Sequence, residues 1–228
     1  MVEVFVCSPD RRKTDAQLWL MSEEKQDIAW RIRDIRDRHC FMAADLLIRY
    51  IIMKRFGISA REIHFKKNQW GKPFLEGKDK FHFSLSHSGQ WAVCAVDSYP
   101  VGVDVEEISP IDYPGIAGRN FSPREYKDLM EKDQDLRLEY FYDLWTAKES
   151  YVKALGTGLN TPLWTFTVKK ADGNTSMIEG PHTGEVLFRQ YGLDAGSRLT
   201  ACTFGHSFSE RVSLVGLEEM VRNLSEIK

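Results

Sequence analysis

The sequence predicts an α+β protein built as two similar lobes. Segments with strand and helix patterns follow in the order strand, helix and strands, and the order then recurs with a second helix and further strands. The chain of 228 residues is long enough to bury a sizeable core, and 43% of its residues are apolar. No low-complexity linker divides it, so we expect the boundary at Tyr99 and Pro100, with residues 1–100 and 101–228 as the lobes.

The first half begins with a strand and continues with a long helical region. Residues 2–7 alternate as a strand does, and residues 22–56 have helical periodicity with a break or bend near His39. Ser22 is a suitable N-cap and Gly57 a suitable C-terminal stop. Further strands follow, separated by turn residues, at positions 62–66, 81–85, 91–97 and 101–106.

The second half contains two helices before it turns β-rich. Ser122, Pro123 and Glu125 form a helix start, with a capping box and proline at the first helical position. The next helix covers residues 141–155 and ends at a Gly-Thr-Gly sequence. A short C-terminal helix closes the chain after expected strands at positions 163–169, 184–191, 198–204 and 211–215.

Composition excludes several classes of protein. The formal net charge of -2 argues against a general nucleic-acid binder, which would normally be basic. No apolar run approaches the roughly 20 residues that span a bilayer, and the start of the chain lacks the pattern of a signal peptide. The four cysteines, Cys7, Cys40, Cys94 and Cys202, lack metal-ligand spacing and fit reduced, buried thiols. We therefore expect a cytoplasmic protein without membrane or nucleic-acid partners.

Two acidic residues lie on one face of the expected strand "VGVDVEE". Side chains alternate along a strand, so Asp104 and Glu106 point the same way, with Cα atoms roughly 7 Å apart. Their carboxylates could converge on Mg²⁺, which takes one or two protein carboxylates together with water and phosphate oxygens. The alternative is a half-buried strand whose acidic face is simply solvated.

Three charged residues lie in the otherwise aromatic and apolar helix "FYDLWTAKESYVKAL". Lys148, Glu149 and Lys153 share a stripe with Trp145, directly beside the apolar stripe of the helix. A solvated face would be expected further round the helix, so these charges could serve a site. The alternative is a surface salt bridge between Glu149 and Lys153, worth roughly 0.3–0.5 kcal/mol.

Phosphate-binding residue types occur in two short segments of the first half. Ser86 and His87 lie in "SLSHSGQW", between two expected strands, and Lys72 lies on the rigid turn "GKP". A nucleophilic serine site is not supported, because the G-x-S-x-G pattern is absent; a plain polar turn is the alternative. Three carboxylates, two lysines and a Ser-His pair would together form a Mg²⁺-pyrophosphate site.

Two longer motifs resemble those of a known enzyme family. "VGVDVE" and "WTAKESYVKALGTGL" resemble the two signature motifs of the 4′-phosphopantetheinyl transferases, and the surfactin-synthetase-activating subfamily matches best. Three more blocks resemble the family in the same order: "WGKPFL", "FSLSHSGQWAVCAVD" and "GRNFSPREYKDL". The matching blocks span about residues 70–159, and the W-x-x-K-E motif is the specific part.

The resemblance implies a pseudo-two-fold symmetric fold with the active site between the lobes. The N-terminal lobe would contact the nucleotide of coenzyme A, and the C-terminal lobe would supply the metal site and the signature helix. The implied reaction moves 4′-phosphopantetheine from CoA to a serine of an acyl or peptidyl carrier protein and releases 3′,5′-ADP. Mg²⁺ is the implied metal, with Mn²⁺ also suited to oxygen ligands. A monomer is expected, because one two-lobed chain can hold the whole site.

The resemblance also implies roles for individual residues. Asp104, Glu106 and Glu149 fall on the metal-ligand positions of the family. Glu149 would take the proton of the serine hydroxyl, Lys153 would stabilise the leaving phosphate and His87 would hold the nucleotide end. The positions that contact CoA correspond to Lys25, Lys72, Pro73, Ser86, His87, Lys148 and Lys153. Residues 111–130 correspond to the segment that meets the carrier protein.

The chain departs from the family pattern near the nucleotide end. Cys40 and Phe41 stand where an arginine and a small residue are usual, and Ile28 replaces a basic residue. These departures bear on contacts with the 3′-phosphate of CoA. They motivate one alternative, a CoA- or carrier-binding module without catalysis. A second alternative is a Mg²⁺-dependent phosphohydrolase that uses the same carboxylates.

Overall fold

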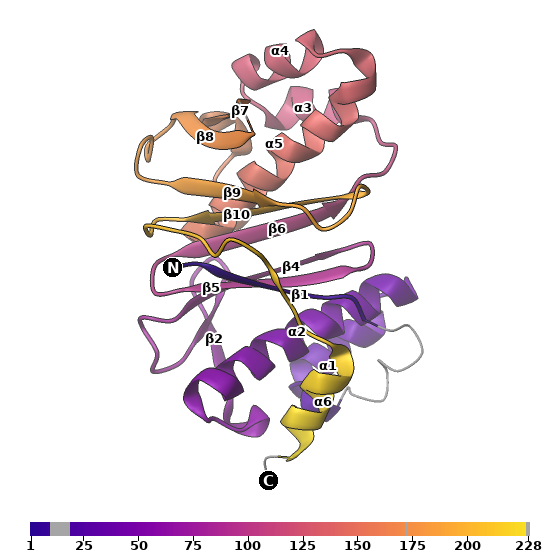
Figure 1. Cartoon of the computed structure of the whole chain (residues 1–228), viewed down its shortest axis with the longest axis vertical. Coiled ribbons are helices and arrows are strands. Elements are labelled where there is room, and N and C mark those ends of the chain that lie inside the picture. Colours follow the sequence, from indigo (N-terminus) through magenta and orange to yellow (C-terminus); the bar gives the residue numbers. More distant parts are fainter. Residues whose placement is uncertain (10–18, 172, 227–228) are drawn as a thin grey trace.

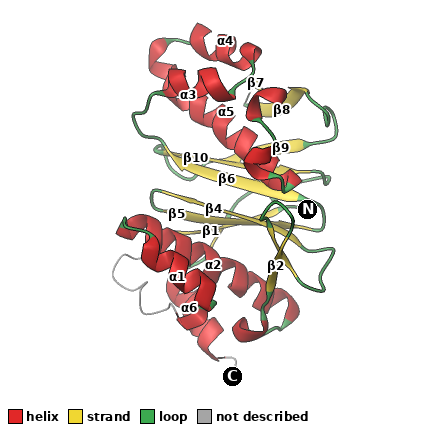
Figure 2. Ribbon diagram, turned by 180° about the vertical axis from the view of Figure 1, so that it is seen from behind, coloured by secondary structure: helices red, strands yellow, loops and turns green. Residues whose placement is uncertain are grey.

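The computed structural model describes residues 1–9, 19–171 and 173–226 and has two stacked lobes (Figure 1). Each lobe pairs a β-sheet with a long helix. The sheets face each other in the middle of the molecule and the helices cover their outer faces (Figure 2). The layers therefore run helix, sheet, sheet, helix, and the predicted α+β two-lobed class is confirmed.

The first lobe is built on a sheet with strand order β11-β1-β5-β4. Helix α2 packs across β1, β4 and β5. The elements of this lobe up to residue 97 are β1 (Glu3–Cys7), α1 (Glu23–Arg31), α2 (Ile35–Phe56), β2 (Phe65–Lys67), β3 (Pro73–Leu75), β4 (His82–Ser88) and β5 (Trp91–Asp97).

The second lobe repeats this plan with the strand order β6-β10-β9 and α5 packed against β6 and β10. Each lobe contains a strand, then a 22-residue helix and then a hairpin. The second strand of the hairpin, β5 or β10, pairs with the strand that begins the lobe, β1 or β6. The elements are β6 (Val101–Glu107), α3 (Tyr113–Asn120), α4 (Pro123–Glu131), α5 (Gln134–Leu155), β7 (Thr167–Ala171), β8 (Asn174–Glu179), β9 (Leu187–Tyr191) and β10 (Ser197–Thr203).

The last segment of the chain returns to the first lobe. Strand β11 (Ser213–Leu214) pairs in parallel with β1, and helix α6 (Leu217–Glu226) packs against α2. The passage from β5 to β6 at residues 98–100 leads from one sheet to the other. The segment 101–228 therefore supplies the second lobe and also the final elements of the first.

Several helix ends form where the sequence predicts them. Gly57 and Gly156 end α2 and α5 with φ of 66° and 74°, a conformation that glycine adopts without a Cβ penalty. Ser122 and Glu125 form the reciprocal capping box of α4. Ser22 stands at the N-cap of α1, although its side chain makes no capping bond.

Other predictions were wrong in position. The break between the first two helices lies at residues 32–34 and not near His39, because the Asp34 side chain accepts hydrogen bonds from the backbone of Arg36 and Asp37 and starts α2 there. Strand β4 continues through Ser88, so the Ser-His segment is strand and not turn. Three elements were not predicted at all: α3, β3 and β8.

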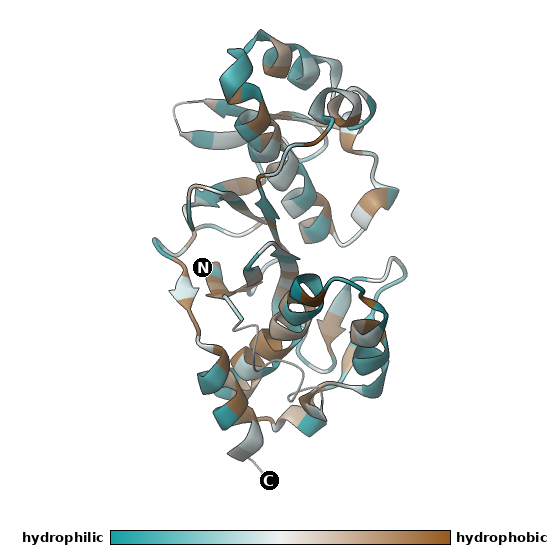
Figure 3. Cartoon of the chain, turned by 90° about the vertical axis from the view of Figure 1, so that its right-hand side faces the viewer, coloured by the Kyte–Doolittle hydropathy of each residue, from teal (hydrophilic) through white to brown (hydrophobic). Residues whose placement is uncertain are grey.

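Apolar residues occupy both lobes and the space between the sheets (Figure 3). Val101, Val103 and Val105 of β6 face the other sheet and pack with valines of β1 and β5. The four cysteines are buried, free thiols, as predicted. Among the residues that the structure describes, no helix combines the length and apolar character needed to cross a bilayer.

Candidate active site at the lobe boundary

Strand β6 is the edge of its sheet, and it lies beside β4 of the other lobe. Between these two strands, hydrogen bonds to serine side chains at alternate positions of β4 replace the backbone hydrogen bonds of a continuous sheet. Ser84 accepts a hydrogen bond from the Val103 amide at 3.1 Å, and Ser88 accepts one from the Glu107 amide at 3.0 Å. These bonds satisfy amides at the edge of the sheet, and the one from Val103 is buried. The two lobes are thus held in register along β6.

Helix α5 packs closely against the face of β6 that carries Gly102, because this residue has no side chain. A Cβ at Gly102 would come within 1.8 Å of the Ser150 carbonyl oxygen in α5. This close approach places Glu149 and Lys153 of α5 above the strand face that carries Asp104 and Glu106. The structure therefore brings together four charged groups of the two sequence motifs, those of Asp104, Glu106, Glu149 and Lys153.

Asp104 is the most enclosed of the three carboxylates, with only 3% of its surface exposed. Its Oδ1 atom accepts hydrogen bonds from Lys153 Nζ at 2.6 Å and from Ser86 Oγ at 2.8 Å. Its Oδ2 atom is buried and has no hydrogen-bond partner among the described residues. A buried carboxylate oxygen without a donor is costly, and a cation would relieve that cost.

The other two carboxylates have raised pKa values. Burial, followed by the charge of Asp104, raises the pKa of Glu106 to about 7, although a hydrogen bond from Ser88 opposes the shift. Burial and the charge of Asp104 also raise the pKa of Glu149, against the effect of Lys153. Each shift means that burial and the neighbouring Asp104 charge disfavour the ionised carboxylate. Such clustered carboxylates are typical of cation or catalytic sites.

These oxygen donors fit a divalent cation in their chemistry, since Mg²⁺ and Mn²⁺ favour carboxylate oxygens. In the part of the chain that the structure describes, however, no three His, Cys, Asp or Glu side chains form a complete metal-binding group. Lys153 lies against Asp104, and Ser88 holds Glu106. Binding a cation would therefore require side-chain rearrangement, and the unpartnered Oδ2 atom of Asp104 is the oxygen that could bind it without giving up a hydrogen bond.

His87 lies beside Ser86 on β4, close to residues of α1 and α2. Its ring meets Phe41 edge-on, with 6.0 Å between ring centroids, and Lys25 Nζ lies 4.9 Å from the centroid of the same phenylalanine. Burial, and then the positive charge of Lys153, lowers the pKa of His87. The structure thus gathers Lys25, Ser86, His87 and Lys153 along one side of the lobe boundary.

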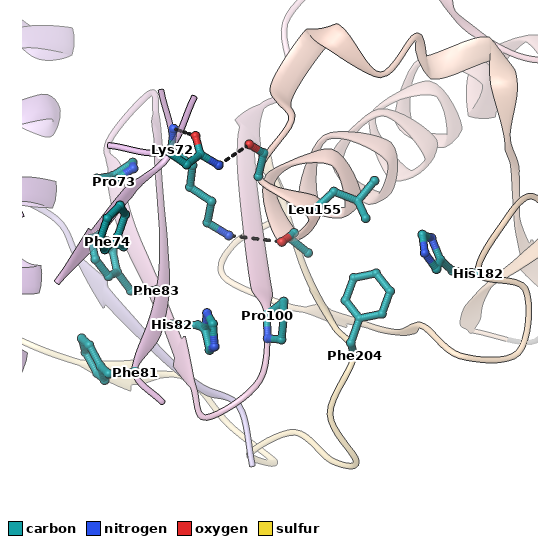
Figure 4. Close-up of a pocket in the computed structure, with 13 residues that line it drawn as sticks. Lys72, Pro73, Phe74, Phe81, His82, Phe83, Pro100, Leu155, His182 and Phe204 are labelled. Carbon is teal, nitrogen blue, oxygen red and sulfur yellow. Dashed lines mark hydrogen bonds between the residues drawn. The ribbon is translucent and has the colours of Figure 1, made fainter. Parts of the chain in front are cut away.

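The Lys72 side chain reaches across the lobe boundary to the end of α5 (Figure 4). Its Nζ atom donates to the carbonyl oxygens of Lys153 at 2.6 Å, Val101 at 3.0 Å and Ala154 at 3.3 Å. The carbonyls at a helix C-terminus attract cations, so Lys72 caps the last turn of α5 from the other lobe. Burial lowers its pKa to about 8. Lys72 therefore clamps the helix that carries Lys153, and its contact with phosphate stays a prediction.

Pro73 borders two cavities on either side of β3. The one beside Lys72, of about 390 Å³, opens between the lobes and is lined by His82, Pro100 and Phe204 among others (Figure 4). The other, of about 260 Å³, lies within the first lobe and includes Lys25.

Lys148 is not at the site. Its side chain has 0% exposed surface and donates to both carboxylate oxygens of Glu125 at 2.6 and 2.8 Å, and to the Phe166 carbonyl at 2.7 Å. Burial lowers its pKa to about 8, against the attraction of Glu125. The expectation that Lys148 contacts CoA was wrong in place: helical spacing gave its stripe, but the fold turns this stripe's inner edge into the core of the second lobe.

Sequence reasoning missed the contributions of Ser84, Ser88 and Asn68. The signal available for the serines was their spacing of two in "SLSHS", because this spacing places Ser84, Ser86 and Ser88 on one strand face. Asn68 holds the turn before β3 through the amides of Trp70 and Lys72, and its Nδ2 donates to the Gly156 carbonyl at 2.9 Å. No local pattern indicates that last contact, because it joins residues from different lobes.

Comparison with known proteins supports the motifs in both lobes. Residues 100–202 match the family model described as the 4′-phosphopantetheinyl transferase superfamily, and residues 7–99 match the model described as 4′-phosphopantetheinyl transferase, N-terminal. The 4′-phosphopantetheinyl transferase Sfp of Bacillus subtilis (strain 168) is 36% identical over 202 residues, which is 88% of this chain and 90% of that protein. A 4′-phosphopantetheinyl transferase of Bacillus subtilis is 38% identical over 91% of this chain and 92% of its own. The 4′-phosphopantetheinyl transferase psf-1 of Bacillus pumilus is 36% identical over 91% of this chain and 89% of its own.

The chain matches phosphopantetheinyl transferases over nearly its whole length, and its candidate site lies at the boundary of two sheet-and-helix lobes. These observations define it as a transferase of phosphopantetheine. It belongs to the 4′-phosphopantetheinyl transferase superfamily, in the Sfp-like subfamily that its motifs indicate.

Lys148→Met and Lys153→Met form a matched pair of changes on one helix. The first leaves Glu125 as an unpaired buried carboxylate, so the free energy of unfolding should fall by about 3–5 kcal/mol. The second should destabilise the fold much less, because Lys153 is partly exposed and Asp104 keeps its bond from Ser86, but should slow transfer about 100-fold or more. Urea unfolding and transfer rates measure both; equal stability losses would contradict the two assignments.

The pKa of Glu106 predicts how stability depends on pH. In the metal-free protein its folded pKa of about 7 exceeds the ordinary value of 4.5, so this group stabilises the fold fully below that ordinary value and loses the contribution as pH rises through 7. Addition of Mg²⁺ should therefore raise the melting temperature more at pH 8 than at pH 6. In Glu106→Gln the difference between the two pH values should shrink; an unchanged difference would show that another group is responsible.

Proposed function

We propose that the site formed by β4, β6 and α5 transfers 4′-phosphopantetheine from CoA to a serine of an acyl or peptidyl carrier protein, with a divalent cation bound by Asp104, Glu106 and Glu149. The observation that carries the proposal is the buried, unpartnered Oδ2 atom of Asp104 among carboxylates of raised pKa, with the Lys153 ammonium at hand. Membership of the family supports the reaction class.

In the proposed reaction the serine oxygen of the carrier attacks the β-phosphorus of CoA. A new oxygen–phosphorus bond forms, the bond from this phosphorus to the bridging oxygen breaks, and 3′,5′-ADP leaves with that oxygen. Glu149 accepts the hydroxyl proton, and burial, which raises its pKa, makes this carboxylate a stronger base than an exposed glutamate. Lys153 donates to the leaving phosphate, where negative charge develops.

A divalent cation, Mg²⁺ or Mn²⁺, would supply further positive charge to offset that of the pyrophosphate. Ser86 lies between Lys153 and Asp104, within 2.9 and 2.8 Å of their polar atoms, so it orients both. Because the reactive hydroxyl comes from the partner, the enzyme needs no nucleophile of its own.

We assign the nucleotide end of CoA to the first lobe. His87 and Lys25 offer a hydrogen-bonding imidazole and an ammonium to its phosphates. The adjacent cavity of about 260 Å³, bordered by Gly71 and Pro73, is our proposed place for the nucleoside. Residues 1–100 would thus supply most nucleotide contacts, and residues 101–228 the cation ligands.

The carrier protein would dock on the second lobe. Residues 111–130 include α3 and α4, which lie at the outer end of this lobe, and Ile111 among them is 38% exposed. We further propose that the enzyme works as a monomer in the cytoplasm, because all the charged groups of the site come from one chain and its cysteines are free thiols.

The test is formation of holo-carrier, followed as the mass increase of a carrier protein in the presence of CoA and Mg²⁺. Glu149→Gln should lower kcat about 100-fold or more, since it removes the proposed base and a cation ligand. Asp135→Asn makes the same kind of change at the exposed start of α5 and should leave the rate unchanged.

Full activity of Glu149→Gln, or of Asp104→Ala, would contradict these roles. Release of 3′,5′-ADP from CoA without a carrier would indicate a hydrolase in place of a transferase. Binding of CoA with no transfer to either an acyl or a peptidyl carrier would indicate a binding module.

A further inference from the structure

We propose that Phe41 is a positioning residue, which holds the ammonium of Lys25 and the imidazole of His87 toward the phosphates of CoA; the proposal rests on the proposed function. The three residues come from different elements, α1, α2 and β4. Lys25 Nζ lies 4.9 Å from the centroid of the Phe41 ring, and the His87 ring meets Phe41 nearly at right angles, at 86° and 6.0 Å. One aromatic ring therefore contacts both proposed phosphate-binding groups.

The contacts use the charge distribution of the ring. Its face is negative and attracts the ammonium, and aromatic pairs favour edge-to-face packing. A free lysine side chain loses much rotational freedom when it binds a ligand. A lysine already held over Phe41 loses less, so CoA should bind more tightly. The phenyl ring has no charge and no hydrogen-bonding atom, so it acts through Lys25 and His87 and not on the phosphate directly.

The neighbouring residue helps to fix this ring relative to β4. Cys40 is buried, and its Sγ atom donates a weak hydrogen bond to the Gly89 carbonyl at 3.5 Å. Gly89 follows Ser88 at the end of the strand that carries His87. The start of α2 is thus attached to β4 next to the site, and Phe41 is partly buried there against the core of the first lobe.

The chain offers a matched control on the same helix. Phe56 has Lys78 Nζ 4.8 Å from its ring centroid and meets Phe81 edge-on at 5.2 Å, so its surroundings resemble those of Phe41. It lies at the other end of α2, away from His87. Phe56→Leu therefore removes equivalent interactions without touching the proposed CoA site.

The experiment compares steady-state transfer and calorimetric CoA binding across three single variants and a Lys25→Met background. Phe41→Leu keeps an apolar side chain but loses the aromatic face, so KM and Kd for CoA should rise about tenfold while kcat stays within about twofold. Phe41→Tyr keeps the face and should retain nearly normal affinity. Phe56→Leu should leave both constants unchanged. In the Lys25→Met background the effect of Phe41→Leu should shrink, because its partner is gone.

Equal CoA affinity in the unaltered enzyme and Phe41→Leu would overturn the inference, as would an equal loss in Phe41→Leu and Phe41→Tyr, which would indicate packing alone. Absence of transfer by the unaltered enzyme would contradict the proposed function instead. The calorimetric comparison needs no transfer, so the two failures are distinguishable.

Discussion

The contact between Lys153 and Asp104 joins helix α5 to strand β6, and Ser86 of the other lobe bonds to both residues. Its formation depends on two features of β6. Gly102 lets α5 approach the strand closely enough for Lys153 to reach Asp104, and the serines of β4 hold the strand edge from the other lobe. Three carboxylates face this single ammonium in the cluster, and burial together with the charge of Asp104 raises the pKa values of Glu106 and Glu149 in spite of it.

Three lysines around α5 show what a helical pattern can and cannot reveal. Lys148 and Lys153 lie on one stripe of the helix, yet the first is buried with Glu125 in the second lobe and the second reaches the site. Lys72 caps the end of the same helix from the other lobe. Periodicity gives the direction of a side chain, but it does not tell whether other parts of the fold bury that side chain. Long-range packing determines this burial, so sequence reasoning grouped the three lysines together.

Local signals predicted much of the remainder. Alternation in "VGVDVEE" separated the valines of the lobe interface from the acidic residues, and the Ser122 capping box and Gly156 marked helix ends correctly. The return of β11 and α6 to the first lobe had no local signal, because strand and helix patterns do not specify partners. The helix break at Asp34 was also missed, because an aspartate within a run of charged residues can equally well be an exposed helix residue or an N-cap.

The proposed function depends above all on Asp104, Glu106 and Glu149 forming one cation site. Binding of Mn²⁺ followed by electron paramagnetic resonance, in the presence of CoA, tests this site without requiring transfer. We expect one tightly bound ion per chain in the unaltered protein and a loss of affinity of about 100-fold in Asp104→Ala. Tight binding of Mn²⁺ that persists unchanged in Asp104→Ala would show that these carboxylates do not form the cation site.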